Sequence, residues 1–375
     1  MRRHLTPQTE GIAAEAARFA GENIAPLDLG REKEFPFAVW RRLGEEGLLG
    51  LLLPREAGGR GLGYTALLAA GEALAREGGN LGIVLSFMIH NVVSRFVVAD
   101  RADGALRGAY LPALARGERT VSLAISEPGV GAHPKHLTTT ARRHDGLFLL
   151  TGEKSYLTNG PFADLYAVLA VTSQEGARKN FSLFLVPRDA AGLSLTPGEV
   201  IDFLRPSPHC GIRLEGCPVP AGHLVGPEGW AYEEVAVPFR DVEDVALMGP
   251  LLGAMEHATS LVTAGLRARG AGIDDETAQE LGRLVYLLDT LQVLAREAAT
   301  VLDGGGAGDG LVSLTLAFRA LARRRQMQLE RLAQKEGLGE TEAFTTAATD
   351  IRRTLGVASA VLRLKQTRLG RGLMT

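Results

Sequence analysis

The first third of the chain has the apolar spacing of helices. Ile12, Ala16, Phe19 and Ile24 recur at near-helical intervals, and Pro26 predicts the end of that helix because proline interrupts helical hydrogen bonding. The same spacing predicts further helices around residue 40 and over 65–76 and 81–98. Residues 1–117 are therefore predicted to form an N-terminal α-helical domain.

The apolar pattern changes to short runs in the middle of the chain. Runs at 121–125, 147–151, 165–171 and 181–186 are rich in Val, Leu, Ile and Phe and are bounded by Gly, Pro, Asn and Asp, which predicts strands joined by tight turns. Asp145-Gly146 predicts a hairpin, since this pair suits the positive φ angles of a two-residue turn. Residues 118–228 are predicted to form a small, β-barrel-like domain.

Helical spacing returns after residue 229. The pattern predicts long helices over 242–267, 276–302 and 312–336 and a shorter one over 347–369. Pro250 should bend the first of these. We expect residues 229–375 to form a C-terminal four-helix bundle domain, and the fold class of the whole chain to be α+β.

Composition narrows the classes of protein that fit. Of the 375 residues, 46% are hydrophobic, which excludes wholesale disorder. The 41 basic residues against 43 acidic ones leave no charge excess for a nucleic-acid partner. Cys210 and Cys217 are too few for a disulfide framework and lack the companions of a zinc site, so no metal site is predicted.

No targeting or membrane segment is expected. The basic start of the chain is followed by polar residues rather than the apolar core of a signal peptide. We found no run of about 20 apolar residues of the kind that spans a bilayer. The expectation is a soluble, cytoplasmic protein that does not bind membranes.

Three strings carry a resemblance to a known family. They are PREAGGRG at 54–61, SEPGVG at 126–131 and GEKSYLTNG at 152–160. Together with the α-β-α order, they make the chain similar to the acyl-CoA dehydrogenase family from nearly end to end. The two later strings resemble that family's flavin-contacting strings and have the same separation. The resemblance implies bound FAD, with Leu123, Ile125, Ser126, Tyr156 and Thr158 as cofactor contacts.

The chemistry of these residues is compatible with a flavin. A flavin ring needs hydrogen-bond donors at its polar edge and flat apolar cover on its face. Ser126 and Thr158 each offer a hydroxyl donor, and Tyr156 stands where the family places an aromatic residue against the ring. The alternative is that both strings are ordinary strand ends with turn-forming Pro, Asn and Gly.

The resemblance also assigns residues to the cofactor phosphates. Arg269 falls where the family has an arginine facing the pyrophosphate of a neighbouring subunit, and Gln279 lies within one residue of an expected glutamine. We therefore expect a homo-oligomer, either a dimer or a tetramer. The string RGAGI at 269–273 departs from the family's Arg-x-x-Phe-Gly, and the later glycine-rich turn is reduced to residues 337–339. An exposed arginine at a helix end is the alternative for Arg269.

A catalytic carboxylate is expected on the first helix of the C-terminal domain. In much of the family the base is a Glu near the C-terminus, where this chain has Gly356. The isovaleryl-CoA and long-chain branches place the base on an earlier helix, and counting back from Gly253 puts Glu243 there. The alternative is that Glu243 belongs to a charged first helical turn. Asp244 replaces the family's arginine and would raise the pKa of Glu243 if both were buried.

The expected substrate-contacting residues depart most from the family's pattern. The resemblance places Asp241, Ala132 and His133 on the substrate side, but Ala132-His133 replaces the family's Ser-Asp and loses a serine of the acyl-CoA channel. His133 either takes over that place or is a solvent-exposed loop histidine. Arg205, Ser207 and His209 align with a stretch that links late strands, and the latter two can be turn residues.

The resemblance implies an FAD-dependent acyl-CoA dehydrogenase. Its substrate would be an acyl-CoA or an acyl-carrier thioester, and its electrons would pass to an electron-transferring flavoprotein. Two alternatives stay open: a flavin oxidase or monooxygenase with the same fold, and a non-catalytic partner subunit that has lost its cofactor. The missing C-terminal Glu and the altered phosphate strings favour the last of these.

Overall fold

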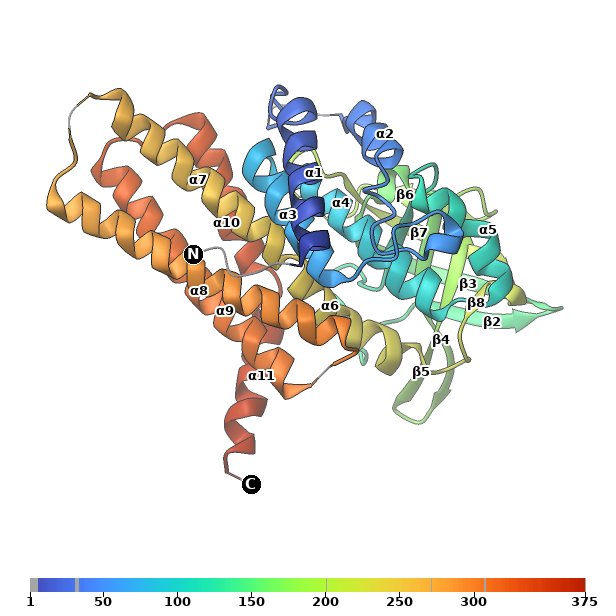
Figure 1. The fold of residues 1–375 in the computed structure, drawn as a ribbon. Helices are drawn as coiled ribbons and strands as arrows, with labels where there is room; N and C mark the ends of the chain where they lie inside the picture. The colour runs from blue at the N-terminus through green and yellow to red at the C-terminus, as the bar shows by residue number, and fades with distance from the viewer. Residues whose placement is uncertain (1–5, 31–33, 200, 271, 307, 375) are drawn as a thin grey trace.

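The N-terminal part of the protein is helical. The computed structural model describes residues 6–30, 34–199, 201–270, 272–306 and 308–374 (Figure 1). Asn80 caps the helix that follows it by accepting a hydrogen bond from the Ile83 N–H at 2.9 Å, and that helix is buried on every side. The helices are α1 (Pro7–Asn23), α2 (Phe37–Glu45), α3 (Tyr64–Gly78), α4 (Leu81–Val93), its π-helical extension η2 (Ser94–Ala99) and α5 (Gly104–Ala115).

The middle part is an eight-stranded mixed sheet within the described residues. Asp145 and Gly146 both have positive φ, 46° and 79°, so the predicted two-residue hairpin is confirmed. The strand order is β6-β7-β3-β2-β4-β5-β8, with β1 parallel to β4. The strands are β1 (Val121–Ala124), β2 (Thr140–His144), β3 (Leu147–Thr158), β4 (Leu165–Glu175), β5 (Arg178–Pro187), β6 (Leu193–Thr196), β7 (His209–Pro220) and β8 (Leu224–Val225).

The C-terminal part is helical again, as predicted, but two of the predicted helices are each divided in two. The first predicted helix is interrupted at Leu247, and Pro250 is the third residue of the new helix α7. In a continuous helix the ring of Pro250 would clash with the carbonyl four residues earlier. Ala358 has a φ of 55° and separates the last two helices. The elements are η5 (Tyr232–Ala236), α6 (Val237–Ala246), α7 (Met248–Ala268), α8 (Asp275–Asp303), α9 (Asp309–Lys335), α10 (Glu342–Gly356) and α11 (Ser359–Gly372).

One hydrophobic core joins the two helical parts, and a second fills the β part. β4 is buried on both faces: Leu165, Ala167 and Leu169 belong to the first core, whereas Tyr166 and Val168 belong to the second. This two-sided burial explains the unbroken apolar run of β4. The α+β prediction of an N-terminal helical, a middle β and a C-terminal helical part is confirmed, and the domain boundaries at 117 and 228 stay predictions.

In the part of the chain that the structure describes, two helical stretches are long and apolar enough to cross a membrane by length and composition. They are Leu81–Ala99, of which 94% is buried inside the fold, and Tyr232–Ala268, of which 72% is buried. Burial of this extent is that of core helices in a folded protein.

The arrangement of the parts places α4 at a junction. Figure 1 shows the sheet at one end of the molecule and the helices α7 to α10 at the other, with α1, α3 and α4 between them. α4 packs against both β1 and α6. The strand before Ser126 and the helix of Glu243 therefore contact the same buried helix.

Candidate functional site

The structure brings the two family-like strings together. The Ser155 N–H donates to the Ser126 carbonyl at 2.9 Å, and the Lys154 ammonium donates to the Ile125 carbonyl at 3.0 Å. Ser122 Oγ donates to the Thr158 carbonyl at 2.8 Å. The continuation of β1 and the end of β3 thus form one edge.

A buried ion pair holds this edge in shape. Lys154 Nζ lies 3.0 Å from Glu127 Oε1, and the two side chains are 0% and 5% exposed. Glu127 also accepts bonds from the Thr138 N–H at 2.7 Å and the Thr139 N–H at 2.9 Å, which tie down the following loop. Burial alone would raise the pKa of Glu127, but Lys154 and these hydrogen bonds outweigh it and lower the pKa to about 2. Sequence reasoning quoted both residues but missed their pairing.

Tyr156 projects from a β-bulge in this edge. The pairing of β3 with β7 shifts register between Lys154 and Leu157, and Tyr156 has a φ of 60°. A bulge of this kind turns a side chain out of the normal alternation, and Tyr156 is accordingly 48% exposed. A tyrosine with positive φ is uncommon, and such conformations concentrate at binding sites.

The side chains along the edge fit one side of a flavin ring. Leu123 and Ile125 are half-buried and pack against the core shared with the helices. Ser126 and Thr158 are also half-buried, and within the described residues neither hydroxyl has a hydrogen-bond partner. Unbonded hydroxyls beside apolar side chains match the needs of a flavin edge, which takes donors at its polar atoms and apolar cover on its face.

The loop after Ser126 reaches toward the C-terminal helices. Ala132 and His133 are exposed, and the Tyr232 hydroxyl donates to the Ala132 carbonyl at 3.4 Å. Tyr232 begins η5, which leads directly into α6. The His133 ring lies 4.9 Å from the ring of His136. These contacts tether the loop near the start of the helix that carries Glu243.

The stretch 205–209 lies beneath the same edge. Ser207 Oγ and Ser86 Oγ of α4 are 2.9 Å apart, and both side chains are buried. The Asn159 side chain donates to the Ser86 carbonyl at 2.9 Å. Burial lowers the pKa of His209 to about 4, so this histidine is neutral at pH 7. Ser207 and His209 are therefore packed side chains rather than free turn residues.

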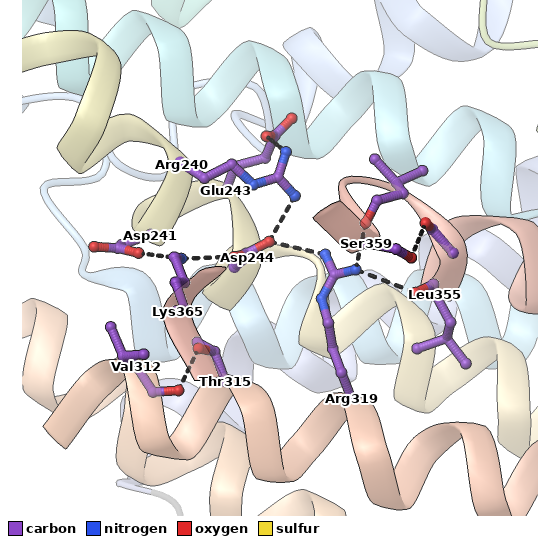
Figure 2. Close-up of polar contacts among 12 residues, drawn as sticks. Arg240, Asp241, Glu243, Asp244, Val312, Thr315, Arg319, Leu355, Ser359 and Lys365 are labelled. Atoms are coloured by element: carbon purple, nitrogen blue, oxygen red, sulfur yellow. Dashed lines mark hydrogen bonds and ion pairs between the residues drawn. The ribbon is translucent and has the colours of Figure 1, made fainter. Parts of the chain in front are cut away.

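Glu243 lies in a network of six charged groups drawn in Figure 2. Arg240 Nη1 donates to Glu243 Oε2 at 2.9 Å, and the Glu243 side chain is 25% exposed. Asp241, the predicted substrate contact, accepts a bond from Lys365 Nζ at 2.6 Å instead. Within the described residues, Glu243 Oε1 has no hydrogen-bond partner, so one oxygen of this carboxylate is available.

Asp244 stands at the centre of that network and is buried, with a side chain 1% exposed. It accepts bonds from Arg240 at 2.7 Å and Arg319 at 2.8 Å and lies 3.3 Å from Lys365 Nζ. Burial would raise the pKa of Asp244, but these three cations outweigh it and lower the pKa. The expectation that Asp244 acts on Glu243 as an unbalanced negative charge omitted these partners, two of which come from distant parts of the chain.

The place of the missing C-terminal Glu lies next to this network. Gly356 ends α10, and Arg319 Nη1 donates to the carbonyls of Leu355 at 3.3 Å and Val357 at 3.0 Å. The same guanidinium bonds Asp244, the neighbour of Glu243. A carboxylate on α6 and one at the α10–α11 junction therefore start from adjoining parts of the structure.

Arg269 and Gln279 are not brought to the flavin edge within one chain. Arg269 Nη1 donates to Glu336 Oε2 at 3.1 Å at the far end of α7, and Gln279 is exposed on α8. Figure 1 places that end of α7 and the sheet at opposite ends of the molecule. Within a single chain, the side chains at the β1–β3 edge fit a flavin ring, but Arg269 and Gln279 lie too far from that edge to contact the phosphates of the same cofactor.

No cluster of three His, Cys, Asp or Glu side chains suited to a metal ion occurs in the part of the chain that the structure describes. Among the described groups with strongly shifted pKa values, Glu127 and Lys154 form an ion pair and Asp350 accepts a bond from the Leu204 N–H.

Comparisons with known proteins identify the family. The acyl-CoA dehydrogenase N-terminal domain matches residues 6–118 and the acyl-CoA dehydrogenase middle domain matches residues 122–217. An L-prolyl-[peptidyl-carrier protein] dehydrogenase of Pseudomonas fluorescens is 30% identical over 321 residues, covering 83% of this chain and 84% of the relative. A mitochondrial isovaleryl-CoA dehydrogenase of Arabidopsis thaliana is 31% identical and covers 68% of this chain and 62% of the relative.

The fold comparison agrees. Butyryl-CoA dehydrogenase from Megasphaera elsdenii superposes with a TM-score of 0.88 at 18% identity and covers 100% of both chains. The two family domains together match more than half of the chain. The chain belongs to the acyl-CoA dehydrogenase family of flavoprotein oxidoreductases.

Proposed function

We propose that this protein is an FAD-dependent dehydrogenase that oxidises the Cα–Cβ bond of an acyl thioester. The observation that carries the proposal is the Ser155 N–H···O=C Ser126 bond of 2.9 Å, which joins the two family-like strings into one edge. Family members bind FAD, which supports the assignment of that edge to the flavin. Bound FAD would accept the substrate's β-hydrogen as hydride.

The chain's own residues have distinct roles at this edge. Ser126 and Thr158 would donate their unbonded hydroxyls to polar atoms of the ring. Leu123 and Ile125 would give apolar cover on the side of the helical core, and the exposed Tyr156 would cover the ring from the bulge. The Lys154–Glu127 pair keeps these side chains in register and exposes no charge to the ring.

We assign the proton-abstracting base to Glu243. Its Oε1 oxygen is unbonded within the described residues, and its helix α6 packs against α4, as β1 does. Residues 351–374 contain neither Asp nor Glu, so the α10–α11 junction offers no carboxylate for this role. A Glu positioned next to the substrate's α-carbon is a suitable general base.

The substrate class follows the relatives in part. The Pseudomonas fluorescens relative acts, by its name, on a prolyl group held by a peptidyl-carrier protein. We propose a thioester carried by CoA or by a carrier protein, with Ala132, His133 and Asp241 on the substrate side and an electron-transferring flavoprotein as the electron acceptor. Arg269 and Gln279 would reach the cofactor phosphates only from a second copy, so the proposal includes a homo-oligomer in the cytoplasm.

The test is anaerobic mixing of the FAD-loaded protein with acyl-CoA and with carrier-bound aminoacyl thioesters, followed by flavin absorbance. Bleaching is expected with one of these classes. Glu243→Gln should retain the flavin spectrum and lose the bleaching, while Glu233→Gln, an exposed acid just before α6, should bleach like the wild type. Bleaching by the Glu243→Gln protein would remove the assignment of the base.

The same preparation distinguishes the alternatives. Rapid consumption of oxygen by the reduced protein would indicate an oxidase or monooxygenase. A folded protein that stays colourless after incubation with FAD would indicate a non-catalytic partner subunit.

A further inference from the structure

The network around Glu243 is balanced in charge. Arg240, Arg319 and Lys365 provide three cations, and Asp241, Glu243 and Asp244 provide three anions. Asp244 is in contact with all three cations, whereas the Glu243 side chain, among the described residues, is bonded to Arg240 alone. The cations are thus concentrated on the buried acid next to the candidate base.

Arg240 is shared between two carboxylates. Its Nη1 donates to Glu243 at 2.9 Å and its Nη2 donates to Asp244 at 2.7 Å. Its Nε is buried and has no acceptor among the described residues. The side-chain bonds that hold this guanidinium are therefore made by its two terminal nitrogens, and loss of the Asp244 bond would leave Glu243 as its remaining carboxylate partner.

Asp244 itself is fixed from two other helices. Arg319 of α9 bonds Asp244 Oδ1 at 2.8 Å and also bonds the Leu355 and Val357 carbonyls at the α10–α11 junction. Lys365 of α11 lies 2.6 Å from Asp241 Oδ1 and 3.3 Å from Asp244 Oδ2. Figure 2 shows Lys365 and Arg319 on opposite sides of Asp244. α9 and α11 therefore each reach the acid next to the candidate base through one cation.

Other titratable groups on the elements packed against α6 have partners of their own or lie in solvent. His90 of α4 bonds the Leu114 carbonyl, and burial lowers its pKa to about 4, so it is uncharged at pH 7. Further groups include Glu72 of α3, which accepts a bond from the Gln292 side chain at 2.7 Å and whose pKa is raised to about 7 by burial and by Glu256. They also include Asp303 of α8, which bonds the backbone of Tyr64 and Thr65 at the start of α3; Glu256 of α7, which pairs with Arg76; Arg101, which bonds the Glu234 carbonyl; and the exposed Glu233 and Glu234 of η5.

We propose that Asp244 and Lys365 are positioning residues that set the protonation and the orientation of Glu243, the first by holding Arg240 and the second by balancing the acids of α6. This inference rests on the proposed function only in taking Glu243 as the base. Asp244 keeps Arg240 from pairing wholly with Glu243, so the carboxylate retains a free oxygen. α11 supplies the cation that balances the neighbouring acids Asp241 and Asp244.

The two positions should change Glu243 in opposite directions. Asp244→Asn removes an anion and leaves three cations facing two acids, so Glu243 should hold its proton less tightly and its titration should move to lower pH. Lys365→Met leaves two cations facing three acids, and the titration should move to higher pH. Each shift should be about 0.5 to 1 pH unit for charges in a partly solvated site.

Two readouts test this. The first is the carboxyl resonance of Glu243 in ¹³C-glutamate-labelled holoprotein without thioester, assigned with Glu243→Gln and followed against pH. The second is the acidic limb of the kcat/KM profile with the thioester that bleaches the flavin. Arg363→Met is the matched control, because it removes an exposed cation from α11 two residues from Lys365. Lys365→Arg should restore the wild-type titration.

Opposite shifts of the two variants, with the Arg363→Met titration unchanged, support the inference. Shifts in the same direction, or none, overturn it. If Asp244→Asn does not fold, the comparison of Lys365→Met with Arg363→Met decides, since an equal titration in these two proteins also overturns it. Bleaching by Glu243→Gln would contradict the assignment of Glu243 as the base. The resonance titration would still test the roles of Asp244 and Lys365, so failure of the proposed function and failure of this inference are distinguishable.

Discussion

The edge formed by β1 and β3, which we propose for the flavin, and the C-terminal candidates are built in different ways. At the edge, backbone bonds, a bulge and one buried ion pair hold side chains whose functional atoms stay unbonded, as at Ser126 and Thr158. In the C-terminal part, the candidate residues are charged and already paired, Glu243 with Arg240 and Arg269 with Glu336. The unbonded hydroxyls of the β1–β3 edge can bind a ligand directly. An ion-paired side chain can bind a ligand only if it shares its partner or loses it.

The largest expected effect is on the ion pair beneath the edge. Lys154→Met would leave Glu127 buried without its cation, so the free energy of unfolding should fall by about 3–5 kcal/mol. Denaturant unfolding measures the change, and flavin content should fall with it. Arg213→Met removes the exposed β7 partner of Glu153, which precedes Lys154 on β3, and should cost less than about 1 kcal/mol. Equal losses would mean that the buried pair does not hold the edge.

The pH dependence of the edge provides a second test. The pKa of Glu127 in the folded protein, about 2, lies below its ordinary value of 4.5, so its ionisation stabilises the fold fully above about pH 4.5 and this contribution is lost as the pH falls through about 2. The difference in unfolding free energy between wild type and Glu127→Gln should therefore shrink as the pH falls from about 4.5 to 2. A difference independent of pH down to 2 would contradict this assignment.

A smaller effect is expected at the bulge. Tyr156→Gly places the residue that best tolerates positive φ where the backbone has a φ of 60°, so stability should stay the same or rise by up to about 1 kcal/mol. The same change removes the ring, and the protein should retain less flavin. Thermal unfolding and flavin absorbance measure the two effects. Tyr156→Phe keeps the ring and should retain flavin like the wild type; a flavin-rich Tyr156→Gly protein would exclude Tyr156 as a cofactor contact.

The smallest effect on stability is expected at Arg269. Its side chain is 43% exposed and its pair with Glu336 is a surface ion pair, so Arg269→Ala should change the unfolding free energy by less than about 1 kcal/mol. Flavin retention should nevertheless fall if a second copy uses this arginine. Lys335→Ala, which breaks the nearby exposed pair with Glu276, should leave flavin retention unchanged. Equal flavin content in both variants would remove Arg269 from the cofactor site.

Local patterns predicted the elements, because their causes lie within a few residues. The Asp145-Gly146 hairpin follows from the φ angles that these residues tolerate, and the break before Pro250 follows from the missing N–H and the ring of proline. The apolar run at 165–171 predicted a strand, which is β4 in the structure. The division at Ala358 carries no such signal, since alanine has no preference for positive φ.

The charged partners of the site could not be predicted in this way. Glu127 and Lys154 are separated by 27 residues, and Asp244 is separated from Arg319 by 75 and from Lys365 by 121. The cation that pairs with a buried acid is determined by how the helices and strands pack. Residue spacing along the chain does not predict that packing. The strings located Ser126 and Thr158 and gave no sign of the network that surrounds Glu243.

Titration of the flavin-free protein with FAD tests the central claim most directly, namely that the joined edge of β1 and β3 is a flavin site. We predict stoichiometric binding by the wild type and binding weaker by about tenfold or more in a folded Ser126→Ala/Thr158→Val double variant, because each lost hydrogen bond is worth about 1 kcal/mol. A wild-type chain that binds no FAD, or a double variant that binds it equally well, would contradict the account.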